Sequence, residues 1–146
     1  MPMYPELMVI PMREELTRLG IEEAKTAADV DKAVADTKGT LMVIVNSICG
    51  CAAGKMRPAV RMALQGSTAK PDKSISVFAG QDTEATAQAR QHFAGQLPSS
   101  PSIGILRDGK LVYFMPRAAI ETRDAMTIAQ ELQTAFAKVC GTAATN

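Results

Sequence analysis

Two cysteines lie one glycine apart in the segment Asn46-Ser47-Ile48-Cys49-Gly50-Cys51-Ala52-Ala53-Gly54. Residues 41–45, immediately before this segment, are all apolar and rich in β-branched side chains. That pattern is typical of a central strand buried on both faces. Residues 52–65, immediately after it, have the composition of a helix. The sequence therefore predicts a strand that delivers two thiols to the start of a helix, an arrangement typical of redox sites.

The rest of the chain alternates between helical and extended patterns. Asp108-Gly109 is a strong hairpin signal between the last two apolar runs, Thr26 with Asp29 predicts a capping box, and Pro58 predicts a kink in the helix that contains it. Helices are expected at residues 12–19, 26–39, 52–65, 82–93 and 120–139, and strands at residues 41–45, 73–79, 103–106 and 111–115. Asp82 is the expected cap of the fourth helix. This order predicts an α/β fold of three layers, α/β/α, with a mixed sheet of about four strands and an N-terminal helical extension.

Composition narrows the class of protein. The 146 residues are expected to form a single domain, residues 1–146, with its own core. A net charge of +1, the absence of Trp and the small number of Phe and Tyr give no sign of a nucleic-acid partner. Residues 1–12 are interrupted by prolines and predict neither a signal peptide nor a membrane span. We therefore expect a cytoplasmic location, where thiols are kept reduced.

The chemistry of the pair depends on what lowers the pKa of a thiol. Cys49 is expected at the start of the helix, where free N–H groups and the helix dipole stabilise a thiolate. Gly50 gives the junction its backbone freedom, and a disulfide closed over one residue is expected to be strained and oxidising. Residues 37–71 contain no acid but five cations, of which Lys55 and Arg57 are the expected supporting residues; the five are Lys38, Lys55, Arg57, Arg61 and Lys70.

Two other interpretations of the cysteines stay open. They can be buried and inert, or they can bind a metal. Cys49, Cys51, Cys140 and His92 contain the donors of a Cys₃His zinc site, although Cys-x-Cys is tighter than the usual spacing. A Cys-Gly-Cys segment also occurs in iron–sulfur carriers. His92 alone is expected to be a surface or edge residue, and Cys140 fits a third redox thiol, a packing residue or a site of intermolecular pairing.

A second motif precedes the third strand. Pro98 and Pro101 flank Ser99 and Ser100. One interpretation is a loop with two prolines; the other is a cis Ser100-Pro101 bond that faces the cysteines. Only about 5–6% of X-Pro bonds are cis in folded proteins, so the second interpretation needs support from the rest of the chain.

That support comes from the order of motifs: strand, Cys-Gly-Cys, proline-containing helix, strand, helix, proline-led strand, hairpin and helix. This order resembles the thioredoxin fold. More closely, the chain resembles the bacilliredoxin family of small bacterial thioredoxin-like proteins. The matching stretches are Val9-Ile10-Pro11-Met12-Arg13, Val45-Asn46-Ser47, Cys49-Gly50-Cys51-Ala52-Ala53-Gly54, Arg57-Pro58-Ala59, Val77-Phe78-Ala79-Gly80-Gln81-Asp82, Pro98-Ser99-Ser100-Pro101-Ser102, Phe114-Met115-Pro116-Arg117 and Cys140.

The resemblance implies a thiol–disulfide oxidoreductase that removes a low-molecular-weight thiol, bacillithiol, from mixed disulfides on cytosolic proteins. It implies Cys49 as the nucleophile, Cys51 as the thiol that resolves or modulates the adduct, and Ser100 and Pro101 as residues that hold the target backbone. No bound cofactor and no metal are implied. The implied partners are S-thiolated proteins, the small-thiol reductant and the reductase of that thiol. A related alternative is disulfide isomerase activity.

One stretch departs from the family pattern. Members are expected to carry histidines after the Pro-Arg pair, whereas residues 118–124 read Ala-Ala-Ile-Glu-Thr-Arg-Asp. The identity of the small thiol is therefore left open by the sequence.

Overall fold

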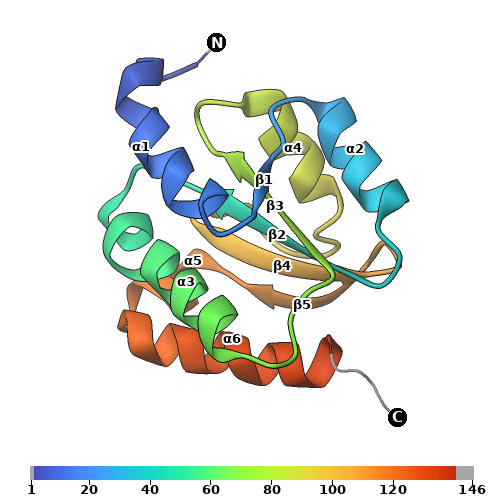
Figure 1. Cartoon of the computed structure of the whole chain (residues 1–146). Coiled ribbons are helices and arrows are strands. Elements are labelled where there is room, and N and C mark those ends of the chain that lie inside the picture. The colour runs from blue at the N-terminus through green and yellow to red at the C-terminus, as the bar shows by residue number, and fades with distance from the viewer. Residues whose placement is uncertain (1, 141–146) are drawn as a thin grey trace.

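The central sheet is mixed and has the strand order β1-β3-β2-β4-β5 in the computed structural model, which describes residues 2–140 (Figure 1). The strands are β1 (Glu22–Glu23), β2 (Thr40–Asn46), β3 (Lys73–Phe78), β4 (Ser102–Arg107) and β5 (Lys110–Met115). β2 runs parallel to β3 and antiparallel to β4, and β5 closes the hairpin with β4. The order of elements and the layers agree with the α/β/α prediction.

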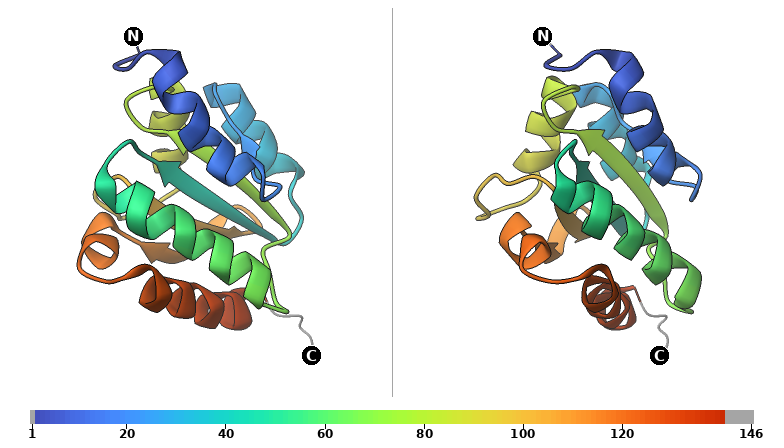
Figure 2. Two further views of the ribbon diagram at one scale, coloured as in Figure 1. Left: turned by 60° about the vertical axis from the view of Figure 1, so that its left-hand side comes forward. Right: turned by 90° about the vertical axis from the view of Figure 1, so that its left-hand side faces the viewer.

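Helices cover both faces of the sheet. The helical elements are α1 (Glu6–Thr17), α2 (Ala27–Asp36), a π-helical turn (Ala52–Met56), α3 (Arg57–Gly66), α4 (Thr83–Gln91), α5 (Arg117–Glu121) and α6 (Ala125–Val139). Figure 2 shows α3 and α6 side by side on one face, with α2 and α4 beyond the sheet on the other. No helix within residues 2–140 has the length and apolar character that a membrane crossing requires.

β2 carries the core on both of its faces. All seven of its residues are buried. Met42 and Ile44 pack with the α3 and α6 side, whereas Val43 and Val45 pack with the α2 and α4 side. Alternation of side chains along a strand produces this division. The buried central strand predicted from residues 41–45 is therefore confirmed.

The sheet has five strands where the sequence predicted about four. The additional strand, β1, consists of Glu22 and Glu23, which pair with Ile75 and Ser76 at the edge of the sheet. Two consecutive glutamates have neither apolar alternation nor β-propensity. Neighbouring β3 provides the pairing that their own side chains do not favour.

Both terminal helices differ from their predicted bounds. α1 begins at Glu6 and contains Pro11, although the prediction began at residue 12. Pro5 is the N-cap residue, where a proline is tolerated, and Pro11 lies inside the helix without ending it. The single helix predicted at residues 120–139 is divided into α5 and α6. Asp124 begins α6 by accepting a hydrogen bond from the Thr127 backbone N–H at 2.8 Å, a cap that the continuous apolar periodicity concealed.

The two predicted caps have different outcomes. Thr26 and Asp29 form the capping box of α2 as predicted. Asp82 precedes α4 but makes no side-chain cap, because its carboxylate binds Arg13 instead. Pro58 lies in the first turn of α3, where its missing N–H is tolerated. The sequence predicted a kink at Pro58. The structure has a π-helical turn, Ala52–Met56, directly before the helix that contains this proline.

The β4–β5 hairpin has a tight turn and an irregular register. Asp108 and Gly109 both adopt positive φ, 50° and 83°, as the hairpin signal requires. The register shifts between Ile105 and Leu106, so that Tyr113 and Leu111 are their partners and Val112 bulges. The bulge lies on β5, whose outer side is an edge of the sheet.

We predict that Gly104→Ala lowers the free energy of unfolding by about 1–3 kcal/mol, the usual cost of overpacking. A Cβ at Gly104 would overlap the ring of Phe93, which packs against Phe114 with its centroid 5.1 Å away. Urea unfolding followed by circular dichroism measures the change. Gly54→Ala is the control, since a Cβ at Gly54 meets no atom within 4 Å. Equal stability of the two variants would show that Phe93 moves aside freely.

Candidate redox site

The two thiols lie where β2 ends and the next helix begins. β2 ends at Asn46, and helical structure starts at Gly50. The Cys49 carbonyl accepts hydrogen bonds from the N–H groups of Ala52 and Ala53 at 3.0 and 3.1 Å, so Cys49 stands at the N-terminus of the helix. The sequence predicted this placement from the strand and helix patterns on either side.

The surface around the thiols is open. Cys49 and Cys51 are free thiols of intermediate exposure, and Gly50 and Gly54 are exposed. A Cβ added at either glycine would meet nothing within 4 Å. Both thiols are therefore partly accessible from outside, and the interpretation of two buried, inert cysteines does not fit.

Local hydrogen bonds decide the acidity of Cys49. Partial burial acts to raise the pKa of its thiol, because a thiolate loses hydration there. Hydrogen bonds from Ser47, Ala52 N–H and Cys51 N–H act in the opposite direction. The positive charge of Arg117 adds to them, and the pKa of Cys49 lies below its ordinary value. Cys49 is therefore a readily ionised nucleophile at the helix N-terminus.

Arg117 is the cation that faces the thiols. Its Nη2 lies 3.8 Å from the Cys51 sulfur, and its charge acts on Cys49. Its Nε is paired with Glu121 at 2.8 Å. Sequence reasoning noted the Pro116-Arg117 pair only as part of the family resemblance. Its position directly after a strand and at the start of a helix was the available signal.

The proline loop lies beside the same arginine. The Ser100-Pro101 bond is cis, as the second interpretation of this loop predicted. Arg117 Nη1 donates to the Ser100 carbonyl at 3.1 Å, and the Arg117 backbone N–H donates to Ser99 Oγ at 3.2 Å. Because one guanidinium contacts both Ser100 and Cys51, it links the cis-proline loop to the cysteine pair.

The supporting residues predicted from charge have other contacts. Lys55 donates to the backbone carbonyl of Glu121 at 2.6 Å and so joins the first helix turns to α5. Arg57 is buried, with 2% of its side chain exposed, and its Nε pairs with Glu15 at 2.9 Å. The cation that acts on the thiolate is thus Arg117 of α5. It lies outside residues 37–71, the stretch whose charges predicted the supporting residues.

Cys140 is remote from the pair. It follows α6 and lies beside Thr40, the first residue of β2, whereas Cys49 follows the last residue of that strand. A strand of seven residues spans about 20 Å. Burial raises the pKa of Cys140, and nearby Asp72 adds to this against a hydrogen bond from Thr40. Cys140 is half-buried and packs against the core on the α3 and α6 side of the sheet.

The proposed Cys₃His site is not assembled. His92 lies at the end of α4, on the opposite face of the sheet, with Nε2 3.4 Å from Asp31. Within residues 2–140, no group of three or more His, Cys, Asp or Glu side chains is arranged to hold a metal ion. The metal and iron–sulfur interpretations of the same cysteines lack the ligands they need in the described chain.

Comparison with known proteins decides the family. Residues 4–140 match the sequence model of a family described as "Disulphide isomerase". A bacilliredoxin of Koribacter versatilis is 61% identical over 142 residues, which are 97% of each chain. A bacilliredoxin of Bacillus licheniformis is 47% identical over 94% of this chain and 95% of that one. The chain belongs to the bacilliredoxin family.

Solved structures show that this bacilliredoxin family member has a thioredoxin fold. Fasciola hepatica thioredoxin matches with a TM-score of 0.55 at 21% identity, over 80% of this chain and 99% of the thioredoxin. A Malassezia sympodialis thioredoxin matches with a TM-score of 0.53 at 13% identity, over 83% and 91% of the two chains. Family and fold together make this bacilliredoxin a thiol–disulfide oxidoreductase.

We predict that Arg117→Gln raises the pH at which Cys49 becomes reactive, because the thiolate loses its neighbouring positive charge. The rate of alkylation by iodoacetamide is measured against pH in a Cys51→Ala, Cys140→Ala background, where Cys49 is the one remaining thiol. In that background the unsubstituted protein is expected to titrate below about 8.5, the value of a free cysteine.

Arg61→Gln provides the matched control, since Arg61 is an exposed cation on α3. It is expected to leave the titration unchanged. An identical profile for both arginine variants would show that the charge of Arg117 does not act on Cys49.

Proposed function

We propose that this protein removes a low-molecular-weight thiol from mixed disulfides on other proteins, with Cys49 as the attacking nucleophile. The observation that carries the proposal is a partly exposed thiol of lowered pKa at a helix N-terminus. Membership of the bacilliredoxin family supports bacillithiol as the small thiol. The proposed clients are S-thiolated proteins of the cytoplasm.

In the first step, the Cys49 thiolate attacks the sulfur of the small thiol in the mixed disulfide. A new disulfide forms between Cys49 and the small thiol, and the client leaves as a thiolate that takes a proton from water. No net oxidation occurs, because one disulfide is exchanged for another. The lowered pKa of Cys49 supplies thiolate at neutral pH.

In the second step, the Cys49 adduct is resolved. The Cys51 thiolate attacks the Cys49 sulfur, expels the small thiol and leaves a Cys49–Cys51 disulfide. Alternatively, a second molecule of the small thiol attacks the adduct and leaves as a symmetrical small-molecule disulfide. Both routes need an external reductant, which we propose is the small thiol together with its reductase. Arg117 supports the first route, because its Nη2 lies 3.8 Å from the Cys51 sulfur.

The cis-proline loop is the proposed holder of the client backbone. Ser100, which precedes Pro101, contacts the same Arg117 guanidinium as Cys51. Pro101 is buried and Ser100 is partly exposed. A loop fixed by Arg117 and by the Ser102 hydroxyl, which donates to the Ser99 carbonyl at 3.0 Å, is a rigid edge for an extended segment beside Cys49.

The deciding experiment is intact mass spectrometry of the Cys51→Ala variant mixed with a single-cysteine carrier protein. The carrier is loaded in turn with bacillithiol, glutathione, cysteine or coenzyme A as a mixed disulfide. We expect Cys49 to gain the mass of the small thiol while the carrier is freed, and the fastest transfer identifies the preferred thiol. Peptide mapping assigns the adduct to Cys49 or Cys140.

The controls and contrary outcomes are clear-cut. Cys49→Ala is expected to form no adduct. If Cys49 becomes linked to the carrier itself, it attacks the other sulfur, and the activity is that of an isomerase, as the description of the matching family reads. If no adduct forms with any thiol, Cys49 is not the nucleophile.

A further inference from the structure

A buried arginine lies behind the thiols and contacts the loop that carries them. Arg57 is 2% exposed. Its Nη1 donates to Asn46 Oδ1 and to the Ser47 carbonyl, each at 2.9 Å. Its Nε binds Glu15 of α1 at 2.9 Å. Burying a cation is costly unless it is paired and hydrogen-bonded, so these contacts fix the guanidinium in one position.

Asn46 is the second residue of this arrangement. Its Oδ1 accepts from the Ser47 backbone N–H at 2.9 Å as well as from Arg57. Its Nδ2 donates to the Met12 carbonyl of α1 at 3.2 Å. Asn46 is 1% exposed. The last residue of β2 is thus held from one side by α1 and from the other by Arg57.

Ser47 connects Arg57 to Cys49. Its carbonyl is held by Arg57. Its Oγ accepts a hydrogen bond from the Cys49 backbone N–H at 3.1 Å, and Ser47 helps to lower the pKa of the Cys49 thiol. The position of one hydroxyl group therefore depends on the contact that Arg57 makes with the same residue.

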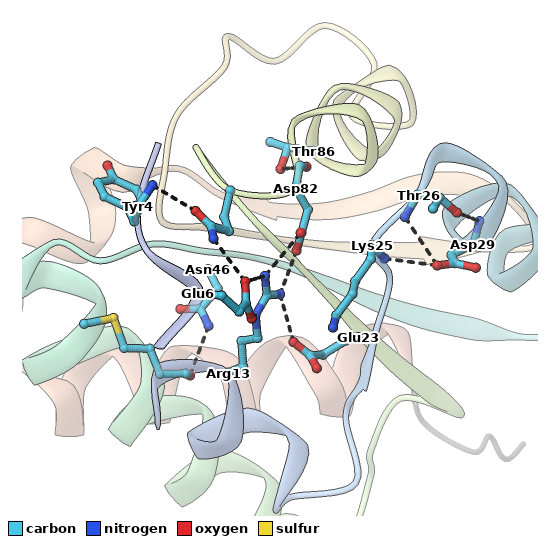
Figure 3. A network of polar contacts seen from close by, with 12 residues as sticks. Tyr4, Glu6, Arg13, Glu23, Lys25, Thr26, Asp29, Asn46, Asp82 and Thr86 are labelled. Atoms are coloured by element: carbon cyan, nitrogen blue, oxygen red, sulfur yellow. Dashed lines mark hydrogen bonds and ion pairs between the residues drawn. The ribbon is translucent and has the colours of Figure 1, made fainter. Parts of the chain in front are cut away.

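α1 is itself anchored firmly. Figure 3 shows the Arg13 guanidinium among the carboxylates of Glu6, Glu23 and Asp82. The nitrogen–oxygen distances to these three are 2.9, 2.9 and 2.7 Å, and the Arg13 guanidinium carbon lies 5.3 Å from the centre of the Phe78 ring. Arg13 follows Met12 directly, so the carbonyl that receives Asn46 belongs to a fixed turn of α1.

We infer that Arg57 is a positioning residue for Cys49: together with Glu15 and Met12 of α1, it holds Asn46 and Ser47 so that the Ser47 hydroxyl stays bonded to the Cys49 backbone N–H and fixes the position of the thiol. The inference rests on the proposed role of Cys49 as nucleophile. It assigns to the N-terminal helix, which touches neither thiol in these contacts, a part in setting their reactivity.

The test is a double-mutant cycle on thiol reactivity in the Cys51→Ala, Cys140→Ala background. Alkylation by iodoacetamide is measured against pH for Ser47→Ala, Arg57→Met and the double variant. Each single variant is expected to shift the titration midpoint upward by about one pH unit, the size of one hydrogen bond to a charged group. If Arg57 acts through Ser47, the double variant shifts no further than Ser47→Ala alone.

Arg57→Lys separates position from charge. Lysine keeps the charge but lacks the planar fork that joins Glu15, Asn46 and Ser47, so it is expected to behave like Arg57→Met. Arg61→Met, an exposed position on the same helix, is the control and is expected to leave the midpoint in place.

Four outcomes would overturn the inference. Lower thermal stability of Arg57→Met with an unchanged midpoint would show a purely structural role. Additive shifts in the double variant would show that Arg57 acts independently of Ser47. A normal profile for Arg57→Lys would show that charge alone matters. Ser47→Ala keeps the cycle informative if Arg57→Met does not fold, since an unshifted Ser47→Ala would also refute it. None of these measurements involves dethiolation, so their outcome is distinguishable from a failure of the proposed function.

Discussion

Burial of β2 on both faces is the constraint on which the rest of the structure depends. Its five apolar residues, 41–45, alternate between two hydrophobic clusters. A strand in this position cannot shift by one residue without exchanging its two faces. Its C-terminal end is therefore fixed relative to the whole core, and the first polar residue there, Asn46, has one available position. The helix N-terminus that follows β2 is therefore held in a fixed position as well.

The electrostatics of the site are local and directional. A thiolate at the helix N-terminus is met by two backbone N–H groups, one hydroxyl and one guanidinium. Cations elsewhere on the surface are separated from it by water and salt, which screen their charge. A near-neutral protein can in this way hold an acidic thiol without an overall positive charge. Arg117 faces the thiols, whereas Arg57 is buried behind them. Their different contacts follow from this difference in exposure and not from their distance in sequence.

The sequence predicted the features that depend on neighbouring residues. The buried strand, the helix directly after the cysteine pair, the hairpin and the Thr26 cap each follow from patterns within a few residues. The features it missed depend on tertiary contacts. β1 exists because β3 offers it a partner. The Asp82 carboxylate does not cap α4 because Arg13, 69 residues away, binds it more strongly than a backbone N–H would. Arg117 lies beside the thiols because β5 brings the chain back to them in the fold.

The irregular pairing of β5 has a consequence for association between molecules. A regular, exposed edge strand is a template on which other chains can add strands and aggregate. The bulge at Val112 interrupts the row of backbone donors and acceptors along β5, and Lys110 places a charge at its start. The thiols can thus stay accessible to the proposed client proteins while the β5 edge of the same sheet resists strand addition.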